Sequence, residues 1–100
     1  MQLGMVGLGR MGANLVRRLL PRGHECVVFD AQSEAVQTLA AEGAKPARDL
    51  RDLVHQLAAP RAIWVMLPAG DSTESTLQEL AGLLSAGDIL IDGGNTHYVD

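Results

Sequence analysis

The stretch Gly7-Leu8-Gly9-Arg10-Met11-Gly12 decides the fold of this chain. It has the spacing G-x-G-x-x-G, it directly follows an apolar run at residues 2–6, and it opens an amphipathic helical pattern at residues 11–20. A strand, a glycine-rich turn and a helix in this order are typical of the first βαβ unit of a dinucleotide-binding domain. We therefore expect the first glycine to permit a tight turn, the second to let a diphosphate approach the backbone, and the third to let the helix pack closely on the strand.

The helix that follows the glycines adds to this interpretation, because its first N–H groups and the positive end of its dipole would face the diphosphate. A glycine-rich turn that serves only the packing of the sheet is the alternative. A P-loop nucleotide hydrolase is excluded, since no Gly-Lys-Ser or Gly-Lys-Thr follows the glycines. The residues predicted to contact the diphosphate are Gly7, Leu8, Gly9, Arg10, Met11 and Gly12.

Short apolar runs alternate with helical patterns along the rest of the chain. The further strands are expected at residues 25–29, 44–47, 62–67 and 89–91. The further helices are expected at residues 33–42, 50–57 and 71–84. This alternation predicts an α/β fold, a Rossmann-like doubly wound parallel sheet of about five strands with crossover helices.

Several single residues refine these expectations. Pro46 cannot donate to a central ladder, so the strand at 44–47 is expected at an edge of the sheet. Ser33 and Asp49 are placed to cap the helices that follow them. Asp71 and Glu74 resemble a capping box. The strand at 62–67 is apolar at every position, as expected for a strand buried on both faces.

Length, composition and charge narrow the class of protein. One hundred residues with 47% hydrophobic side chains fit one domain, the cofactor-binding part at residues 1–100. A complete domain of this kind has six strands, so we expect the chain to be truncated before the last strand. The net charge of −4 argues against nucleic-acid binding. A single cysteine rules out an internal disulfide, and no signal peptide or membrane span is visible, so a cytoplasmic protein is expected.

Asp30 bears on the choice of cofactor. It follows the second strand, eighteen residues after Gly12, where an acidic side chain accepts hydrogen bonds from the adenosine ribose. A 2′-phosphate at this place would be repelled by the carboxylate, and the next residues, Ala31, Gln32 and Ser33, offer no arginine to receive it. The pattern therefore favours NAD over NADP. A plain turn or helix-capping role for Asp30 is the alternative, and it would leave the cofactor open.

The far end of the chain carries a family resemblance. Val65-Met66-Leu67-Pro68-Ala69-Gly70, and Gly87-Asp88-Ile89-Leu90-Ile91 leading into Asp92-Gly93-Gly94-Asn95, resemble the decarboxylating 6-phosphogluconate dehydrogenases, as does the glycine loop. The related 3-hydroxyisobutyrate dehydrogenases have serine and threonine where this chain has Gly94-Asn95. Asp-Gly-Gly-Asn is therefore the most specific of these signals, although Gly-Gly-Asn alone is more often an ordinary turn.

The resemblance implies roles for individual residues. Asp30, Ala31 and Gln32 would surround the adenosine ribose, and Leu67, Pro68 and Ala69 would line the cofactor cleft. Asn95 would contact both the nicotinamide and the substrate. NADP-using members of the family have Asn-Arg-Ser or Asn-Arg-Thr at positions 30–32 and often a basic residue at position 68. This chain departs from both patterns and resembles the shorter, NAD-preferring branch.

The resemblance also implies a reaction, the oxidative decarboxylation of 6-phosphogluconate to ribulose 5-phosphate in the pentose phosphate pathway. The family's general base, a lysine, and its acid, a glutamate, would lie beyond Asp100, so no catalytic residue is assigned here and the chain alone is expected to be inactive. A helical substrate and dimerisation domain is expected to be absent, and with it the contacts of a homo-oligomer.

No histidine or cysteine has a partner at metal-ligand spacing. A 3-hydroxyisobutyrate-type dehydrogenase and a non-catalytic dinucleotide-binding module are the alternatives.

Overall fold

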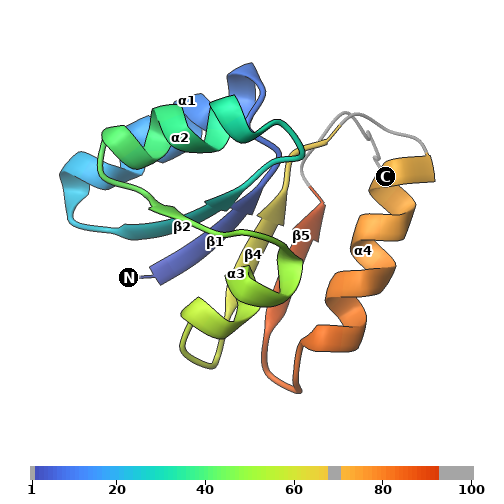
Figure 1. Ribbon diagram of the computed structural model, residues 1–100. Coiled ribbons are helices and arrows are strands. Elements are labelled where there is room, and N and C mark those ends of the chain that lie inside the picture. The colour runs from blue at the N-terminus through green and yellow to red at the C-terminus, as the bar shows by residue number, and fades with distance from the viewer. Residues whose placement is uncertain (1, 68–70, 93–100) are drawn as a thin grey trace.

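The computed structural model describes residues 2–67 and 71–92, and within these ranges five parallel strands form one sheet (Figure 1). Their order across the sheet is β3-β2-β1-β4-β5. This is the order of the first five strands of a doubly wound dinucleotide-binding fold. The predicted Rossmann-like α/β class is thereby confirmed. The strands are β1 (Gln2–Val6), β2 (Glu25–Phe29), β3 (Lys45–Pro46), β4 (Ala62–Val65) and β5 (Ile89–Asp92).

Helices cover both faces of the sheet (Figure 1). The elements are α1 (Arg10–Leu19), the short 3-10 helix η1 (Leu20–Arg22), α2 (Ser33–Ala41), α3 (Leu50–Gln56) and α4 (Asp71–Leu83). α1 and α2 lie on one face, and α3 and α4 lie on the other. Among the described residues, no helix has the length and apolar character that crossing a membrane requires.

Each face of the sheet has its own hydrophobic layer, because successive side chains of a strand point to opposite faces. Met5 in β1 and Val28 in β2 are fully buried under α1 and α2, whereas their chain neighbours Val6 and Val27 pack against α3 and α4. The layer under α1 and α2 consists of Leu3, Met5, Leu8, Val16, Cys26, Val28, Val36, Leu39 and Ala44. The layer under α3 and α4 consists of Val6, Val27, Ala47, Leu50, Leu53, Val54, Leu57, Ile63, Val65 and Leu80.

Two local predictions are confirmed. β3 lies at an edge of the sheet, and Pro46 is part of it. Asp49 caps α3, since its Oδ1 accepts a hydrogen bond of 2.7 Å from the N–H of Asp52. The helical segment after the glycine loop, α1 with η1, ends before Gly23, which has a left-handed φ of +89°.

Three others need correction or go untested. Ser33 is the first residue of α2 and not its cap; Gln32 takes the cap position because Asp30 already holds the Gln32 N–H in a turn. The strand predicted over 62–67 ends at Val65, and Ala62 and Trp64 are only partly buried because α1 and α2 do not cover this part of the sheet fully. The side chain of Asp71, and so the predicted capping box, lies outside the described part of the chain.

Candidate functional site

The glycine loop lies where the carboxyl ends of β1, β2 and β4 meet. The N–H of Gly7 donates to the carbonyl of Phe29 at the end of β2 (2.9 Å), and the N–H of Met66 donates to the carbonyl of Val6 (2.7 Å). The loop is therefore attached to the strand on either side of β1. In a doubly wound sheet, ligands bind at the carboxyl ends of the strands.

Two of the three motif glycines are required by the protein's own packing. Gly7 has a φ of +97°, and a Cβ on it would lie 2.6 Å from the carbonyl oxygen of Met66. A Cβ on Gly12 would overlap the carbonyl oxygen of Gly7. The predicted roles of these glycines, a tight turn and close packing of the helix, are confirmed.

Gly9 is different. Its φ of −67° and ψ of −168° are open to any residue, and a Cβ on it would meet no atom of the described residues within 4 Å. Packing therefore gives no reason for glycine here. The missing side chain leaves free space directly in front of the first turn of α1, which is what a ligand approaching the backbone needs.

The first turn of α1 offers hydrogen-bond donors to this space. Gly9 is the N-cap residue and makes no side-chain cap. The N–H of Ala13 bonds to the carbonyl of Gly9 at 2.9 Å, so the N–H groups of Arg10, Met11 and Gly12 precede the first helical bond. This turn contains no acidic residue. Its donors and the helix dipole together favour an anion.

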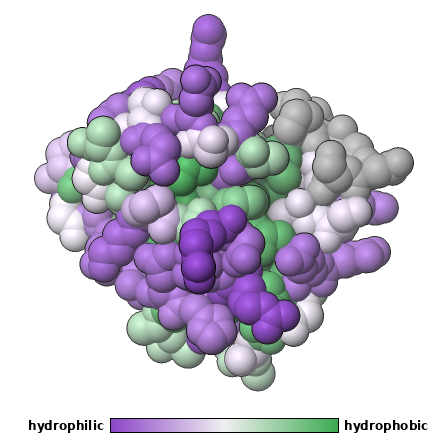
Figure 2. Space-filling view, in the orientation of Figure 1, coloured by the Kyte–Doolittle hydropathy of each residue, from purple (hydrophilic) through white to green (hydrophobic). Residues whose placement is uncertain are grey.

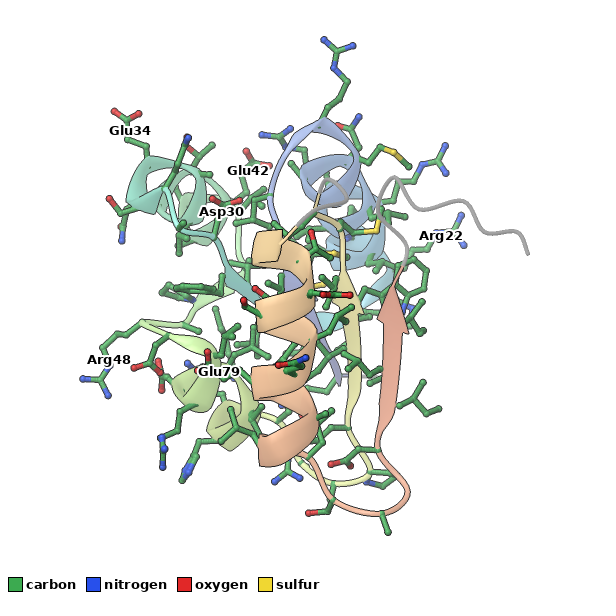
Figure 3. All side chains as sticks on the ribbon, turned by 90° about the vertical axis from the view of Figure 1, so that its right-hand side faces the viewer. Arg22, Asp30, Glu34, Glu42, Arg48 and Glu79 are labelled. Carbon is green, nitrogen blue, oxygen red and sulfur yellow. The ribbon has the colours of Figure 1, made fainter. Side chains whose placement is uncertain are left out.

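Asp30 lies beside the glycine loop. Its Oδ2 accepts a hydrogen bond of 2.6 Å from the N–H of Leu8, and its Oδ1 accepts one of 2.8 Å from the N–H of Gln32. The second contact is the local turn that formed the alternative interpretation, and the first reaches across to the loop. The contact of Asp30 with the adenosine ribose stays a prediction. In Figure 3 Asp30, which is partly exposed, lies between α1 and α2, whereas Glu34 points outward.

A cavity of about 500 Å³ adjoins Asp30. This volume is within the range of small-molecule sites. Its walls come from the end of β2, the start of α2 and the segment after β3: Phe29, Asp30, Ala31, Ser33, Val36, Gln37, Pro46, Ala47 and Arg48. Among the predicted site residues, Asp30 and Ala31 line it. The walls from β3 onward were missed in the sequence, although the edge position predicted for β3 was the signal that could have found them.

Arg48 is the positively charged residue among those that line this cavity. Its side chain is 88% exposed, and its Nε lies 3.8 Å from Asp52 Oδ2. The backbone N–H of Arg48 also donates to that oxygen (2.9 Å), and this bond, followed by the guanidinium charge, lowers the pKa of Asp52. Figure 3 shows Arg48 pointing away from the body of the molecule and from Asp30. The guanidinium is thus not paired with the Asp30 carboxylate.

A second cavity of similar volume runs along the outer side of α1. It is lined by Met11, Asn14, Leu15, Arg17 and Arg18. Met11, an apolar residue of the predicted amphipathic helix, is 60% exposed and is not part of the core. The reason is its place in the first turn of the helix, beyond the end of the sheet. In the view of Figure 2, hydrophilic side chains cover most of the surface, and apolar atoms show between them.

The β4 side of the predicted cleft is described only up to Leu67. The Leu67 side chain lies against the glycine loop, since a Cβ on Gly7 would come within 2.9 Å of Leu67 Cδ2. The other predicted residues on this side, Pro68, Ala69 and Asn95, lie outside the described residues. Within residues 2–67 and 71–92, no three His, Cys, Asp or Glu side chains are grouped so that they could hold a metal ion. Cys26 is buried in β2, and desolvation raises the pKa of its thiol.

Comparison with known proteins places this geometry in a family. A family profile described as the NAD binding domain of 6-phosphogluconate dehydrogenase matches residues 2–100. The NAD(+)-dependent, decarboxylating 6-phosphogluconate dehydrogenase of Haloferax volcanii is 49% identical over 98 residues, which are 98% of this chain and 33% of that protein. The chain thus spans about a third of the length of this relative.

Solved structures agree on the fold. The 6-phosphogluconate dehydrogenase of Plasmodium falciparum superposes with a TM-score of 0.89 at 24% identity, over 98% of this chain and 22% of the other. The 3-hydroxyisobutyrate dehydrogenase of Mycobacterium tuberculosis gives a TM-score of 0.82 at 26% identity, over 93% of this chain and 31% of the other. The resemblance drawn from the sequence is confirmed: this chain belongs to the family of NAD-binding domains of 6-phosphogluconate dehydrogenase.

Proposed function

We propose that this chain binds NAD and forms the cofactor-binding domain of a 6-phosphogluconate dehydrogenase. The observation that carries the proposal is the free space at Gly9, which faces the open N–H groups of the first turn of α1. A diphosphate fits both features, because it needs close access to the backbone and several N–H donors at once. The backbone around Gly7, Leu8, Gly9, Arg10, Met11 and Gly12 would hold it.

The adenosine half of the cofactor would extend from this loop toward β2 and β3. Each oxygen of Asp30 accepts one backbone N–H and retains a lone pair, so the carboxylate can still accept bonds from the ribose hydroxyls. Ala31 and Gln32 would flank the ribose. The adjoining cavity has the size and the mixed lining expected for the adenine ring.

NAD is preferred over NADP in this proposal because the carboxylate of Asp30 would lie next to a 2′-phosphate. Two like charges at short range in a partly enclosed site repel each other. Arg48, the cation of the cavity wall, points outward and is already paired with Asp52. The relative from Haloferax volcanii is named as NAD(+)-dependent, which agrees with this preference.

The nicotinamide half would lie on the opposite side of the loop, against Leu67, Pro68 and Ala69. Asn95 would contact both the nicotinamide and the substrate, 6-phosphogluconate. When bound, NAD supplies the hydride acceptor for the oxidation that precedes loss of CO₂. The residues of this chain bind and orient the cofactor, and we assign none of them a catalytic role. In the whole protein we expect a helical domain to complete the substrate site and a homo-oligomer, in the cytoplasm.

The test of cofactor binding is calorimetric titration of the chain with NAD and with NADP. We expect NAD to bind more tightly, and we expect Asp30→Ala to narrow the ratio of the two affinities. Glu34→Ala is the matched control, because it removes the same charge from a side chain that points outward nearby. Tighter binding of NADP than NAD by the unsubstituted chain would contradict the cofactor assignment.

The test of the reaction is a steady-state assay of the full gene product with NAD and either 6-phosphogluconate or 3-hydroxyisobutyrate. Turnover of 6-phosphogluconate supports the proposal. Turnover of 3-hydroxyisobutyrate alone would favour the related dehydrogenases, one of which shares 26% identity with this chain. Binding of NAD without turnover of either would favour a non-catalytic module.

A further inference from the structure

We propose that Asp30 is also a positioning residue, which holds the glycine loop in its diphosphate-binding shape before the cofactor arrives. This inference rests on the proposed function, since it concerns the same site. It adds a ligand-independent role to the carboxylate. The hydrogen bond of 2.6 Å between Leu8 N–H and Asp30 Oδ2 joins residues 22 positions apart and is the contact on which the inference is built.

The loop has two successive attachments to the end of β2. The N–H of Gly7 donates to the carbonyl of Phe29, and the N–H of Leu8 donates to the side chain of Asp30. The first is a backbone bond that any sequence could make. The second depends on the side chain at position 30, and its ionised acceptor makes it stronger than a neutral bond.

A glycine-rich loop needs such an attachment more than other loops do. Gly7 and Gly9 leave the backbone more conformations to lose on ordering than other residues would. Leu8, between them, is anchored at both ends: its side chain is buried in the layer under α1 and α2, and its N–H is bound to Asp30. Fixing Leu8 fixes where Gly9 and the first turn of α1 begin. The donors of that turn are then already aimed at the diphosphate position.

Asp30 links two parts of the proposed cofactor site, the glycine loop and the start of α2. Both oxygens of Asp30 face backbone N–H donors, one from the loop and one from the start of α2. An asparagine has one oxygen and one NH₂, so it could satisfy one of these donors and would present a donor to the other. Replacing Asp30 to change cofactor preference would therefore also loosen the loop or the turn.

The direct test needs no substitution. In the ¹⁵N,¹³C-labelled chain without ligand, a long-range HNCO experiment detects coupling across a hydrogen bond. We expect a cross-peak between the Leu8 amide and the Asp30 side-chain carboxyl carbon. Its absence, with the Gly7 to Phe29 cross-peak present as an internal reference, would overturn the proposal.

Two further readouts separate positioning from ribose binding. In Asp30→Asn the hydrogen exchange of the Leu8 amide should quicken by about tenfold, the effect of losing about 1.4 kcal/mol of hydrogen bonding. Asp49→Asn is the matched control, because Asp49 also accepts a backbone N–H (2.7 Å) but caps α3. Amides of the fully buried Ile63 and Val65 in β4, away from both substitutions, report on global stability in both variants.

The second readout compares ADP with 2′,3′-dideoxy-ADP, which lacks both ribose hydroxyls. If Asp30 acts through the ribose alone, Asp30→Asn leaves the affinity for dideoxy-ADP unchanged or raises it, because a negative charge near the diphosphate is removed. If Asp30 positions the loop, this affinity falls several-fold. Both readouts must change; an unchanged Leu8 exchange rate or an undiminished affinity for dideoxy-ADP overturns the proposal. Failure of the unsubstituted chain to bind ADP and NAD would instead refute the proposed function, and the cross-peak would still decide the role of Asp30.

Discussion

At the scale of single residues, the three glycines of one motif have three separable causes. Gly7 needs its positive φ, Gly12 needs to lack a Cβ because of the Gly7 carbonyl, and a Cβ on Gly9 would have no atom of residues 2–67 or 71–92 within 4 Å. The sequence motif predicted these roles because each glycine has a fixed place between strand and helix. In the part of the chain that the structure describes, packing explains Gly7 and Gly12 but gives no reason for glycine at position 9. A ligand is therefore the cause we assign to Gly9.

Alanine substitutions separate these causes. Gly9→Ala should change the free energy of unfolding by no more than about 1 kcal/mol, since its backbone angles suit alanine and the methyl meets open space. The same methyl should weaken NAD binding about tenfold or more, because it would occupy the diphosphate position. Urea unfolding and calorimetry measure the two effects.

Two variants serve as controls for this comparison. Gly12→Ala should destabilise the fold by about 1–3 kcal/mol or more, through the clash with the Gly7 carbonyl. Gly82→Ala, in an exposed and open position on α4, should leave both stability and NAD binding near those of the parent or raise stability slightly. If Gly9→Ala destabilised the fold as much as Gly12→Ala does, packing would explain the glycine at position 9 after all.

At the scale of elements, the sequence predicted the order and type of the strands and helices, since each has an apolar pattern of its own period. The ends of elements were harder. Ser33 was expected to cap α2, but the turn made by Asp30 begins that helix one residue earlier. The cavity beside Asp30 could not be predicted in full, because the parallel pairing of β2 and β3 brings the segment after β3 next to the end of β2 and the start of α2.

Arg61 and Asp88, which directly precede β4 and β5, link the amino ends of these two strands. The Asp88 carboxylate is fully enclosed and accepts bonds from the N–H groups of Ser85 (2.8 Å) and Arg61 (2.6 Å) and from the Arg61 guanidinium (3.1 Å). These contacts, the backbone bonds first, lower the pKa of Asp88 below its usual range. Arg61 Nε also donates to the carbonyls of Val54 and Leu57 at the end of α3.

This lowered pKa predicts a dependence of stability on pH. A carboxyl whose pKa is lower in the folded chain stabilises the fold above the unfolded pKa, and this contribution is lost as the pH falls through the folded value. We expect the free energy of unfolding to drop below about pH 4. Asp88→Asn should have lower stability at pH 7 and a flatter acid dependence, measured by urea unfolding at several pH values. An equally steep acid dependence in Asp88→Asn would show that other carboxyls cause it.

At the scale of the whole molecule, the sheet separates two hydrophobic layers. The site lies at the carboxyl ends of the strands, where both layers end. The layer under α3 and α4 supports β1 directly: Leu53 is fully buried and lies over Gly4, where a Cβ would approach Leu53 Cδ2 to 2.9 Å. The strand that leads into the glycine loop is therefore fixed by packing from α3. Burial of this kind follows from apolar periodicity, which is why the sequence could predict it.

Removing this support should lower stability without touching the site. Leu53→Ala is expected to cost about 2–5 kcal/mol, the usual range for a buried leucine. Ile89→Ala, at a side chain that is 56% exposed, should cost less than half as much. Urea unfolding of both variants checks the difference. Similar costs for the two would mean that the layer under α3 and α4 is not the one that supports the sheet.

Binding of a diphosphate at the glycine loop can be followed directly by titrating the ¹⁵N-labelled chain with NAD and recording the amide chemical shifts. We expect the largest shifts at the backbone amides of residues 8–12, with smaller ones around Asp30 and along the cavity from Ala31 to Arg48, and little change in α3. Shifts that leave residues 9–12 unmoved, or that gather on the outer side of α1 at Asn14 and Arg18, would contradict it.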